Sequence, residues 1–348
     1  MIDDTLHFER LRGPRGTTLT ELVVALGVIG ILAALALPAV QNAREASRRN
    51  QCADHLRQLG IAAQNHASAH ADLFPYTATN GYDPKQRRRV PSISPHRSLL
   101  EYLDLSAVAS GIDRDKDIIN LPGEPPQSLD PLLAKLAASA FPMFLCPSDV
   151  PRRGATNYRA NMGYGPGVFG PGPPAYAGFV GNAAGAFVYD RRVSAAEFHD
   201  GLENTVMFSE KLLGDGNPAR YTPWTDYFYY GLGDILTADE AVAACGSLAL
   251  PIPPHASYGG WTWLLGGWNS TWYNHILTPN SPVPDCSAGG EIMAGGGKGA
   301  YTARSFHPGG VNAVFAGGSA RFINDQIDPR VWRALSSRAG GEPLGETW

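Results

Sequence analysis

Residues 22–40 read LVVALGVIGILAALALPAV, a run of nineteen residues without a charged side chain. A helix of this length spans about 28 Å, close to the roughly 30 Å of hydrocarbon in a bilayer. Pro38 lies inside the run, and a membrane helix tolerates a proline because it removes only one backbone hydrogen bond. The later apolar residues 261–268 are too few and too rich in glycine to span a membrane. The sequence therefore predicts one membrane-spanning helix, residues 22–40, near the start of the chain.

Three interpretations of this run are open. The first is a secretory signal peptide, with Arg10, Arg12 and Arg15 before the run and an Ala-Leu-Ala cleavage site at 34–36. The second is a plain signal anchor. The third is a signal that is cleaved ahead of the run, so that the run stays in the mature protein. The run is longer than the 7–15 residues typical of a secretory signal, and Glu21 stands directly before it. A carboxylate at membrane depth costs about 3 kcal/mol and usually has a partner, which favours the third interpretation.

The residues around Glu21 carry a resemblance. The string GTTLTEL at 16–22 resembles the type IV prepilin cleavage and methylation motif. The resemblance implies that prepilin peptidase cuts between Gly16 and Thr17 and methylates the new amine of Thr17. It also implies that Glu21, then the fifth residue, pairs with the terminal ammonium of a neighbouring subunit. Thr17 departs from the family pattern, in which phenylalanine is usual.

The helix is expected to continue beyond the membrane, over residues 18–70. Apolar or small residues recur at helical spacing at Ala46, Ala53, Leu56, Gly60 and Ala63. Arg44, Arg48 and Arg49 follow the apolar run, where they can reach lipid headgroups, and they balance the upstream arginines, so orientation rests on the prepilin resemblance. The predicted organisation is a leader at 1–16, a pilin-like helix at 17–72 and a body at 73–348.

The body is predicted to be rich in strands and loops, because the chain has 40 Gly, 28 Pro and only 17% charged residues. Strands are expected at 177–180, 186–189, 205–208, 313–315 and 320–323, with short helices at 98–105 and 129–140. Gly317-Gly318 is expected to form a hairpin turn. The fold class is α+β: a long helix, half transmembrane, packed on a mostly antiparallel globular domain. The net charge of −4 argues against nucleic acid as a partner.

Strings throughout the chain resemble a planctomycete-type family of pilin-like proteins with a domain of unknown function, called DUF1559 or "H-X9-DG". The matching strings include FLCPSD at 144–149, TNY at 156–158, DG at 200–201, ENT at 203–205, YNH at 273–275 and HPGGVN at 307–312. The family-motif residues among them are Cys146, Asp149, Asp200, Asn204 and His307. The final Asp-Gly of the family is Gly317-Gly318 here, so the role of that aspartate is lost or moved. The resemblance implies a location and a secretion or pilus context, not an activity.

The chain has four cysteines at wide spacings and no CxxC pair, which argues against a zinc site. Two disulfides are expected in an oxidising compartment, Cys245–Cys286 and Cys52–Cys146, and buried free thiols remain the alternative.

Several polar side chains of the body have two interpretations, one as a chemical site and one as a structural element. One interpretation of His307 is a metal ligand or an acid–base group, with His275 or Asp200 as its partner. The other, which we favour, is a histidine whose ring forms a hydrogen bond with the backbone at a turn. Calcium coordination is a further hypothesis, for Asp149, Asp200, Glu203 and Glu210. The glycine-rich residues 295–299 lack the features of a phosphate loop. We therefore expect no enzyme, no cofactor and no metal.

Aromatic side chains are concentrated between residues 258 and 273. The tryptophans are Trp261, Trp263, Trp268 and Trp272. They either form a core or are exposed to bind glycan or protein. We expect a structural, pilin-like or pseudopilin-like subunit of a type II secretion or type IV pilus-like assembly, in the inner membrane with its body outside the cytoplasm or at the cell surface. Its partners would be prepilin peptidase and other pilin-like subunits. The alternative is a membrane-anchored binding module that uses the aromatic region.

Overall fold

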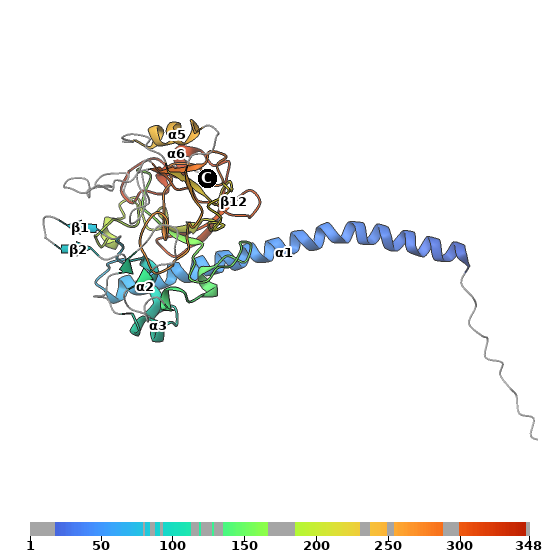
Figure 1. Ribbon diagram of the computed structural model, residues 1–348, viewed down its shortest axis with the longest axis horizontal. Helices are drawn as coiled ribbons and strands as arrows, with labels where there is room; N and C mark the ends of the chain where they lie inside the picture. Colours follow the sequence, from blue (N-terminus) through green and yellow to red (C-terminus); the bar gives the residue numbers. More distant parts are fainter. Residues whose placement is uncertain are drawn as a thin grey trace, which may run out of the picture. The chain divides into compact units, whose positions relative to one another are not determined.

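The computed structural model describes most of the chain (Figure 1). The described residues are 18–78, 81–83, 88–90, 93–112, 118–119, 127–128, 135–165, 185–229, 237–248, 254–287 and 299–345. They form two compact units, residues 1–47 and residues 48–348. The long N-terminal helix contributes to both units, which are described in turn.

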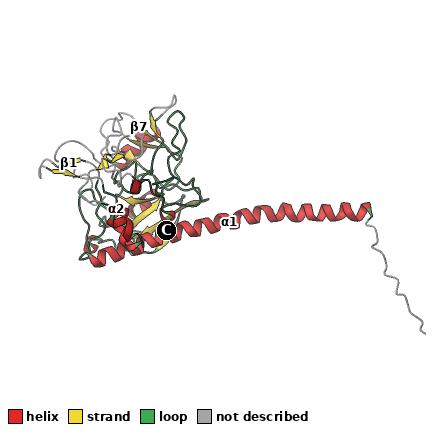
Figure 2. Ribbon diagram, turned by 60° about the horizontal axis from the view of Figure 1, so that its bottom comes forward, coloured by secondary structure: helices red, strands yellow, loops and turns green. Residues whose placement is uncertain are grey.

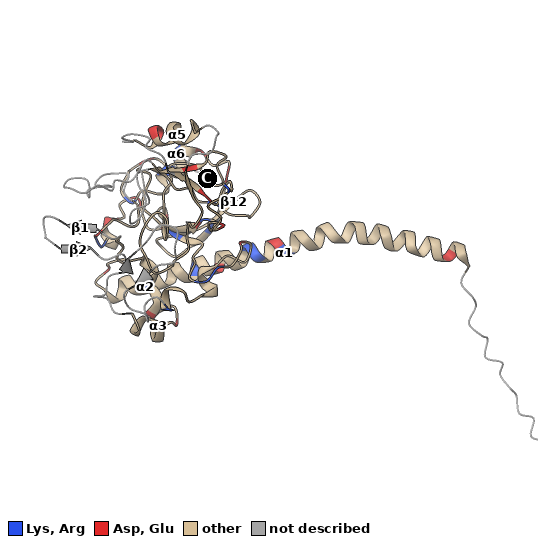
Figure 3. Ribbon diagram, in the orientation of Figure 1, with Lys and Arg blue, Asp and Glu red and all other residues tan. Residues whose placement is uncertain are grey.

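The first unit is the N-terminal half of helix α1, Leu19–Ala69. The helix begins with a capping box, in which the Thr18 amide donates to Glu21 Oε2 at 2.9 Å and the Glu21 amide donates to Thr18 Oγ1 at 3.3 Å. Pro38 lies inside the helix. Among the residues that the structure describes, α1 is the one helix long and apolar enough to cross a membrane, and its apolar part is not buried. Figure 3 shows the charge-free stretch.

The second half of α1 belongs to the body. Its buried face contains Cys52, Leu56, Gly60 and Ala63. The predicted apolar stripe is thus confirmed for Leu56, Gly60 and Ala63, whereas Ala46 is exposed. The helix ends at Ala69, within one residue of the predicted end, and the chain then turns through two residues with positive φ.

The largest sheet has five strands in the order β13-β12-β6-β5-β9. Their bounds are β5 Tyr158–Asn161, β6 Val206–Glu210, β9 Trp272–Tyr273, β12 Gly310–Phe315 and β13 Ala320–Asn324. Only the β5–β9 pair is parallel. Strands β12 and β13 form a hairpin through Gly317-Gly318, and Gly318 has φ +95°. The predicted strands 205–208, 313–315 and 320–323 and their hairpin turn are confirmed.

A second sheet has four strands in the order β11-β10-β7-β8. Its members are β7 Tyr227–Tyr229, β8 His255–Ala256, β10 Asp285–Ser287 and β11 Gly299–Ala300. Two further strand pairs are small: β1 Gly81–Asp83 with β2 Arg88–Val90, and β3 Ile118–Ile119 with β4 Gln127–Ser128. Antiparallel pairs predominate among the described strands, so the α+β expectation holds.

Short helices and loops complete the body, and Figure 2 shows how much of it is loop. The remaining helices are α2 Pro95–Leu99, α3 Ser106–Ser110, α5 Ala238–Gly246, α6 Pro329–Ala334 and the 3-10 helices η1 Leu100–Tyr102, η2 Pro142–Phe144 and η4 Ala195–Glu197. The predicted helix at 98–105 corresponds to α2 and η1. Of the predicted helix at 129–140, residues 135–137 are helical and 129–134 lie outside the described residues.

One predicted strand is wrong. Residues 186–189 make only isolated bridges, from Tyr189 to Thr77 and from Val188 to Arg191. Asp190 adopts φ +51° and reverses the chain, so the segment cannot extend into a ladder. The predicted strand 177–180 lies outside the described residues.

Candidate functional site

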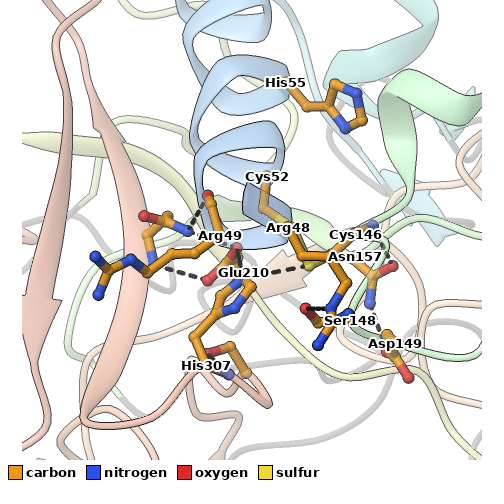
Figure 4. The surroundings of a disulfide bond; sticks show 12 residues. Arg48, Arg49, Cys52, His55, Cys146, Ser148, Asp149, Asn157, Glu210 and His307 are labelled. Atoms are coloured by element: carbon orange, nitrogen blue, oxygen red, sulfur yellow. Dashed lines mark hydrogen bonds and ion pairs between the residues drawn. A yellow bond between two sulfur atoms is a disulfide. The ribbon is translucent and has the colours of Figure 1, made fainter. Parts of the chain in front are cut away.

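A disulfide joins α1 to the body. Cys52 lies on the buried face of α1, and Cys146 follows η2 in the family string at 144–149. The two sulfurs are bonded, and the Cα atoms are 5.1 Å apart (Figure 4). The disulfide therefore connects the helix covalently to a loop ninety-four residues later in the chain.

The imidazole of His307 lies beside this disulfide. Its Nε2 is 3.4 Å from Cys146 Sγ and 3.2 Å from Glu210 Oε1. Glu210 ends strand β6, and His307 stands in the turn that precedes β12. The Glu210 carboxylate also accepts from the Asn312 backbone amide at 2.7 Å and from Asn312 Nδ2 at 3.0 Å. Cys52, Cys146, Glu210 and His307 are all buried, which excludes water from their contacts.

The loop that carries Cys146 is fixed by a second set of hydrogen bonds. The Cys146 amide donates to Asn157 Oδ1 at 3.0 Å, and Asn157 Nδ2 donates to Asp149 Oδ2 at 2.6 Å. The Leu213 amide also donates to Asp149 Oδ2, at 2.9 Å. Burial raises the pKa of Asp149, against the opposing effect of these donors. The family residues Cys146 and Asp149 thus both stabilise the loop that follows η2.

Two other family residues, Asp200 and Asn204, form a separate turn. Gly201 has φ +97°, and Asn204 Nδ2 donates to the Asp200 carbonyl at 2.9 Å. The Asp200 carboxylate accepts from the backbone amides of Gly340 and Gly341 at 2.7 and 2.9 Å. The predicted turn is confirmed, and Asp200 holds the C-terminal segment.

The partners expected for His307 are wrong. Asp200 bonds the C-terminal segment, and His275 lies between Tyr273, whose hydroxyl is 2.8 Å from Nε2, and Trp332, whose carbonyl oxygen is 2.7 Å from Nδ1. His307 does lie at a turn, but its Nε2 faces side chains rather than backbone. The partner that the sequence did not indicate is Glu210, which is ninety-seven positions earlier in the chain (307 − 210).

The calcium hypothesis is also wrong for the described residues. Asp149, Asp200 and Glu210 each accept hydrogen bonds from different backbone amides, and Glu203 lies elsewhere, beside Arg321. Within the described part of the chain, one group of side chains has the ligand types and proximity to hold a metal: Cys52, Cys146, Glu210 and His307, whose ligand atoms lie within 4.8 Å of one another. The wide sequence spacing concealed it, since each residue comes from a different segment.

The Glu203 carboxylate lies next to Gly317, where the family pattern has an aspartate. A Cβ atom on Gly317 would lie 1.9 Å from Glu203 Oε1. The Ser319 hydroxyl donates to Glu203, and Arg321 lies 3.5 Å from the same carboxylate. The carboxylate of Glu203 thus occupies the space into which an aspartate at position 317 would extend, at the β12–β13 turn.

The aromatic region is core. Trp263, Trp268 and Trp272 are fully buried. Trp261 is half-buried, donates from Nε1 to the Gly214 carbonyl at 3.1 Å and lies 5.2 Å from the Arg152 guanidinium. The core interpretation is therefore confirmed for Trp263, Trp268 and Trp272, and the alternative of an exposed aromatic binding surface is wrong for these three side chains.

The second disulfide, Cys245–Cys286, joins α5 to β10. Both cysteines belong to an apolar cluster with Phe228, Ala241 and Ile276. Both predicted disulfides are confirmed, and the alternative of buried free thiols is wrong. Gly16, Thr17 and residues 295–298 lie outside the described residues.

These features define an α+β protein with one N-terminal apolar helix that is long enough for a single membrane span or signal anchor. A family model described as "Protein of unknown function (DUF1559)" matches residues 41–330, so the chain belongs to this family. No curated protein and no solved structure shows a significant match to the chain. The family and the apolar helix together suggest a membrane-anchored surface protein.

Proposed function

We propose that the protein is a pilin-like or pseudopilin-like structural subunit, held in the inner membrane by α1, of a type II secretion or type IV pilus-like assembly. The observation that carries the proposal is the exposure of the large apolar side chains along residues 19–40, which ranges from 47% at Val40 to 79% at Leu19. A surface this apolar needs lipid or neighbouring apolar helices as cover.

The position of Glu21 supports the same proposal. The carboxylate stands at the first turn of the helix, where the Thr18 amide is its partner within the chain. A carboxylate has about four acceptor positions, so one amide leaves room for a second donor. In the proposed assembly that donor is the methylated ammonium of Thr17 from a neighbouring subunit, after prepilin peptidase has cut behind Gly16.

The disulfide at Cys52 supports a structural role for the helix beyond anchoring. A helix that served only as an anchor would need no covalent bond to the body, whereas here α1 also buries Leu56 and Ala63 in the body core. The part of α1 that follows residue 47 is thus a structural component of the body. We propose this structural role in place of an enzymatic one.

The decisive experiment is N-terminal sequencing of the protein extracted from membranes after coexpression with a prepilin peptidase. We expect Thr17, with a methylated amine, as the first residue. The variant Gly16→Glu should remain uncut, and the matched control Gly13→Glu, in the same leader, should be cut normally. A soluble protein that begins after Ala36 would refute the proposal, because the apolar helix would then be lost.

A second experiment separates the two roles of Glu21. Glutamine retains the capping hydrogen bond but has no charge to pair with an ammonium group. We therefore expect Glu21→Gln to be processed normally and to lose incorporation into cross-linked assemblies. Normal incorporation of this variant would contradict the proposed pairing with the Thr17 amine.

A further inference from the structure

We propose that the dithiol form of Cys52 and Cys146 binds one Zn²⁺ ion together with Glu210 and His307, and that disulfide formation releases the ion. The four residues carry the ligand types that zinc prefers: two thiolates, an imidazole nitrogen and a carboxylate oxygen. They lie around one point in the interior, as Figure 4 shows.

The two distances that involve His307 Nε2 are close to those of a tetrahedral site. With zinc–sulfur, zinc–nitrogen and zinc–oxygen bonds of about 2.3, 2.05 and 2.1 Å, neighbouring ligands are about 3.6 Å apart for N and S and about 3.4 Å apart for N and O. The corresponding distances are 3.4 Å from His307 Nε2 to Cys146 Sγ and 3.2 Å to Glu210 Oε1. The two sulfurs must separate, to about 3.8 Å in the same geometry. Their Cα atoms, 5.1 Å apart, allow this by side-chain rotation.

Outer hydrogen bonds hold three of the four ligands. Asn312 donates twice to the Glu210 carboxylate, Asn157 accepts from the Cys146 amide, and the His307 amide donates to Ser305 Oγ at 3.1 Å. Such contacts orient metal ligands and are a regular part of metal sites. The ligands are thus positioned without the metal, which reduces the entropy cost of binding.

The electrostatics of the buried site also favour a cation. Two thiolates, one carboxylate and a neutral imidazole carry three negative charges, which cannot remain buried without compensation. A divalent ion offsets two of them. Arg48 lies one helical turn before Cys52, and its Nε donates to Ser148 Oγ at 3.2 Å, beside the Cys146 loop. A positive side chain therefore borders the site.

The second disulfide provides an internal comparison. A disulfide by itself requires only good packing, as Cys245 and Cys286 show in their apolar cluster. No third ligand from the described residues joins that pair in a possible metal group. The first disulfide differs because the buried His307–Glu210 pair lies beside it, and this pair would complete a four-ligand site once the S–S bond is open.

The exchange between the two forms is balanced. Zinc binding to the dithiol releases the two thiol protons. A disulfide oxidoreductase in its oxidised form then accepts two electrons by thiol–disulfide exchange: its own S–S bond breaks and takes up two protons from solvent to give a dithiol, the Cys52–Cys146 bond forms, and Zn²⁺ leaves. A reducing compartment thus favours the metal form and an oxidising compartment the disulfide.

The test uses the full-length protein in detergent, reduced with a phosphine under argon and titrated with Co²⁺ as a spectroscopic probe. We expect one tetrahedral cobalt per chain with a thiolate charge-transfer band, displaced by Zn²⁺. The variant Cys245→Ser/Cys286→Ser should give the same spectrum, and Cys52→Ser/Cys146→Ser should lose it. Reoxidation with a disulfide reagent should release the ion.

His307→Ala and Glu210→Gln should weaken cobalt binding about 100-fold or more, because each removes one of four ligands. Near-ultraviolet circular dichroism before titration checks that each variant is folded. His307→Cys should restore binding, since it returns a zinc ligand, which a purely structural role of the imidazole would not predict. An unchanged spectrum in Cys52→Ser/Cys146→Ser, or no thiolate band in the reduced wild-type protein, would overturn the proposal.

Discussion

The packing of α1 against the β12–β13 hairpin can be tested at Gly60. This glycine lies on the buried face of the helix, and a Cβ added there would be 2.5 Å from Val314 Cγ2 and 3.2 Å from the Gly318 Cα atom. Both distances are shorter than ordinary carbon–carbon contacts. Gly60→Ala therefore forces the helix away from the hairpin or moves Val314, whose branched side chain has few alternative rotamers.

Two opposing effects determine the magnitude. Replacing glycine by alanine inside a helix stabilises it by about 1 kcal/mol. Overpacking a close contact costs about 1–3 kcal/mol. The sum is a net destabilisation of about 1 kcal/mol. The matched control is Gly246→Ala in α5, where an added Cβ meets nothing within 4 Å and should not destabilise the protein.

The assay is urea unfolding of the oxidised, full-length protein in detergent, followed by the emission of the buried tryptophans. A double-mutant cycle with Val314→Ala isolates the contact, because removing Cγ2 makes room for the new methyl group. We expect Gly60→Ala/Val314→Ala to be more stable than the sum of the single effects by about 1 kcal/mol. Stabilisation by Gly60→Ala, or additivity in the cycle, would refute the close approach of helix and hairpin.

Three further perturbations address other parts of the structure. Burial lowers the pKa of His275 from 6.5 to about 3, so the stability gained by keeping it neutral is complete above pH 6.5 and is lost as pH falls toward 3. Between about pH 7 and pH 4, protonation of His275 in the unfolded chain should therefore raise the equilibrium constant for unfolding by up to about tenfold for each pH unit of acidification. In His275→Gln, this equilibrium constant should depend less on pH. Gly317→Asp should displace the exposed Glu203 carboxylate and weaken its contacts with Ser319 and Arg321, so thermal unfolding should show a loss of less than about 1 kcal/mol that is absent when the same change is made in a Glu203→Ala background. Cys245→Ala/Cys286→Ala opens a loop of 41 residues and should lower the urea unfolding free energy by about 4 kcal/mol, whereas an unchanged midpoint would mean that this bond does not constrain the unfolded chain.

Local sequence determined much of the architecture. The apolar run at 22–40 and the small residues near Gly60 were sufficient to predict one long helix, since helix formation depends on contacts within a few residues. The glycine pair at 317–318 located the hairpin for the same reason. The family strings in the sequence also identified Cys146 and His307 as candidate site residues.

Tertiary structure decided what those residues contact. Cys52, Cys146, Glu210 and His307 meet only because α1, the loop after η2, the end of β6 and the turn before β12 converge, and no spacing along the chain encodes that convergence. The same holds for Glu203, whose carboxylate lies beside Gly317 at the β12–β13 turn, and for Trp268, which is buried against Trp272 and Tyr301. Short-range propensity selects helices and turns, whereas the partner of a side chain is set by long-range packing of segments that are distant in sequence.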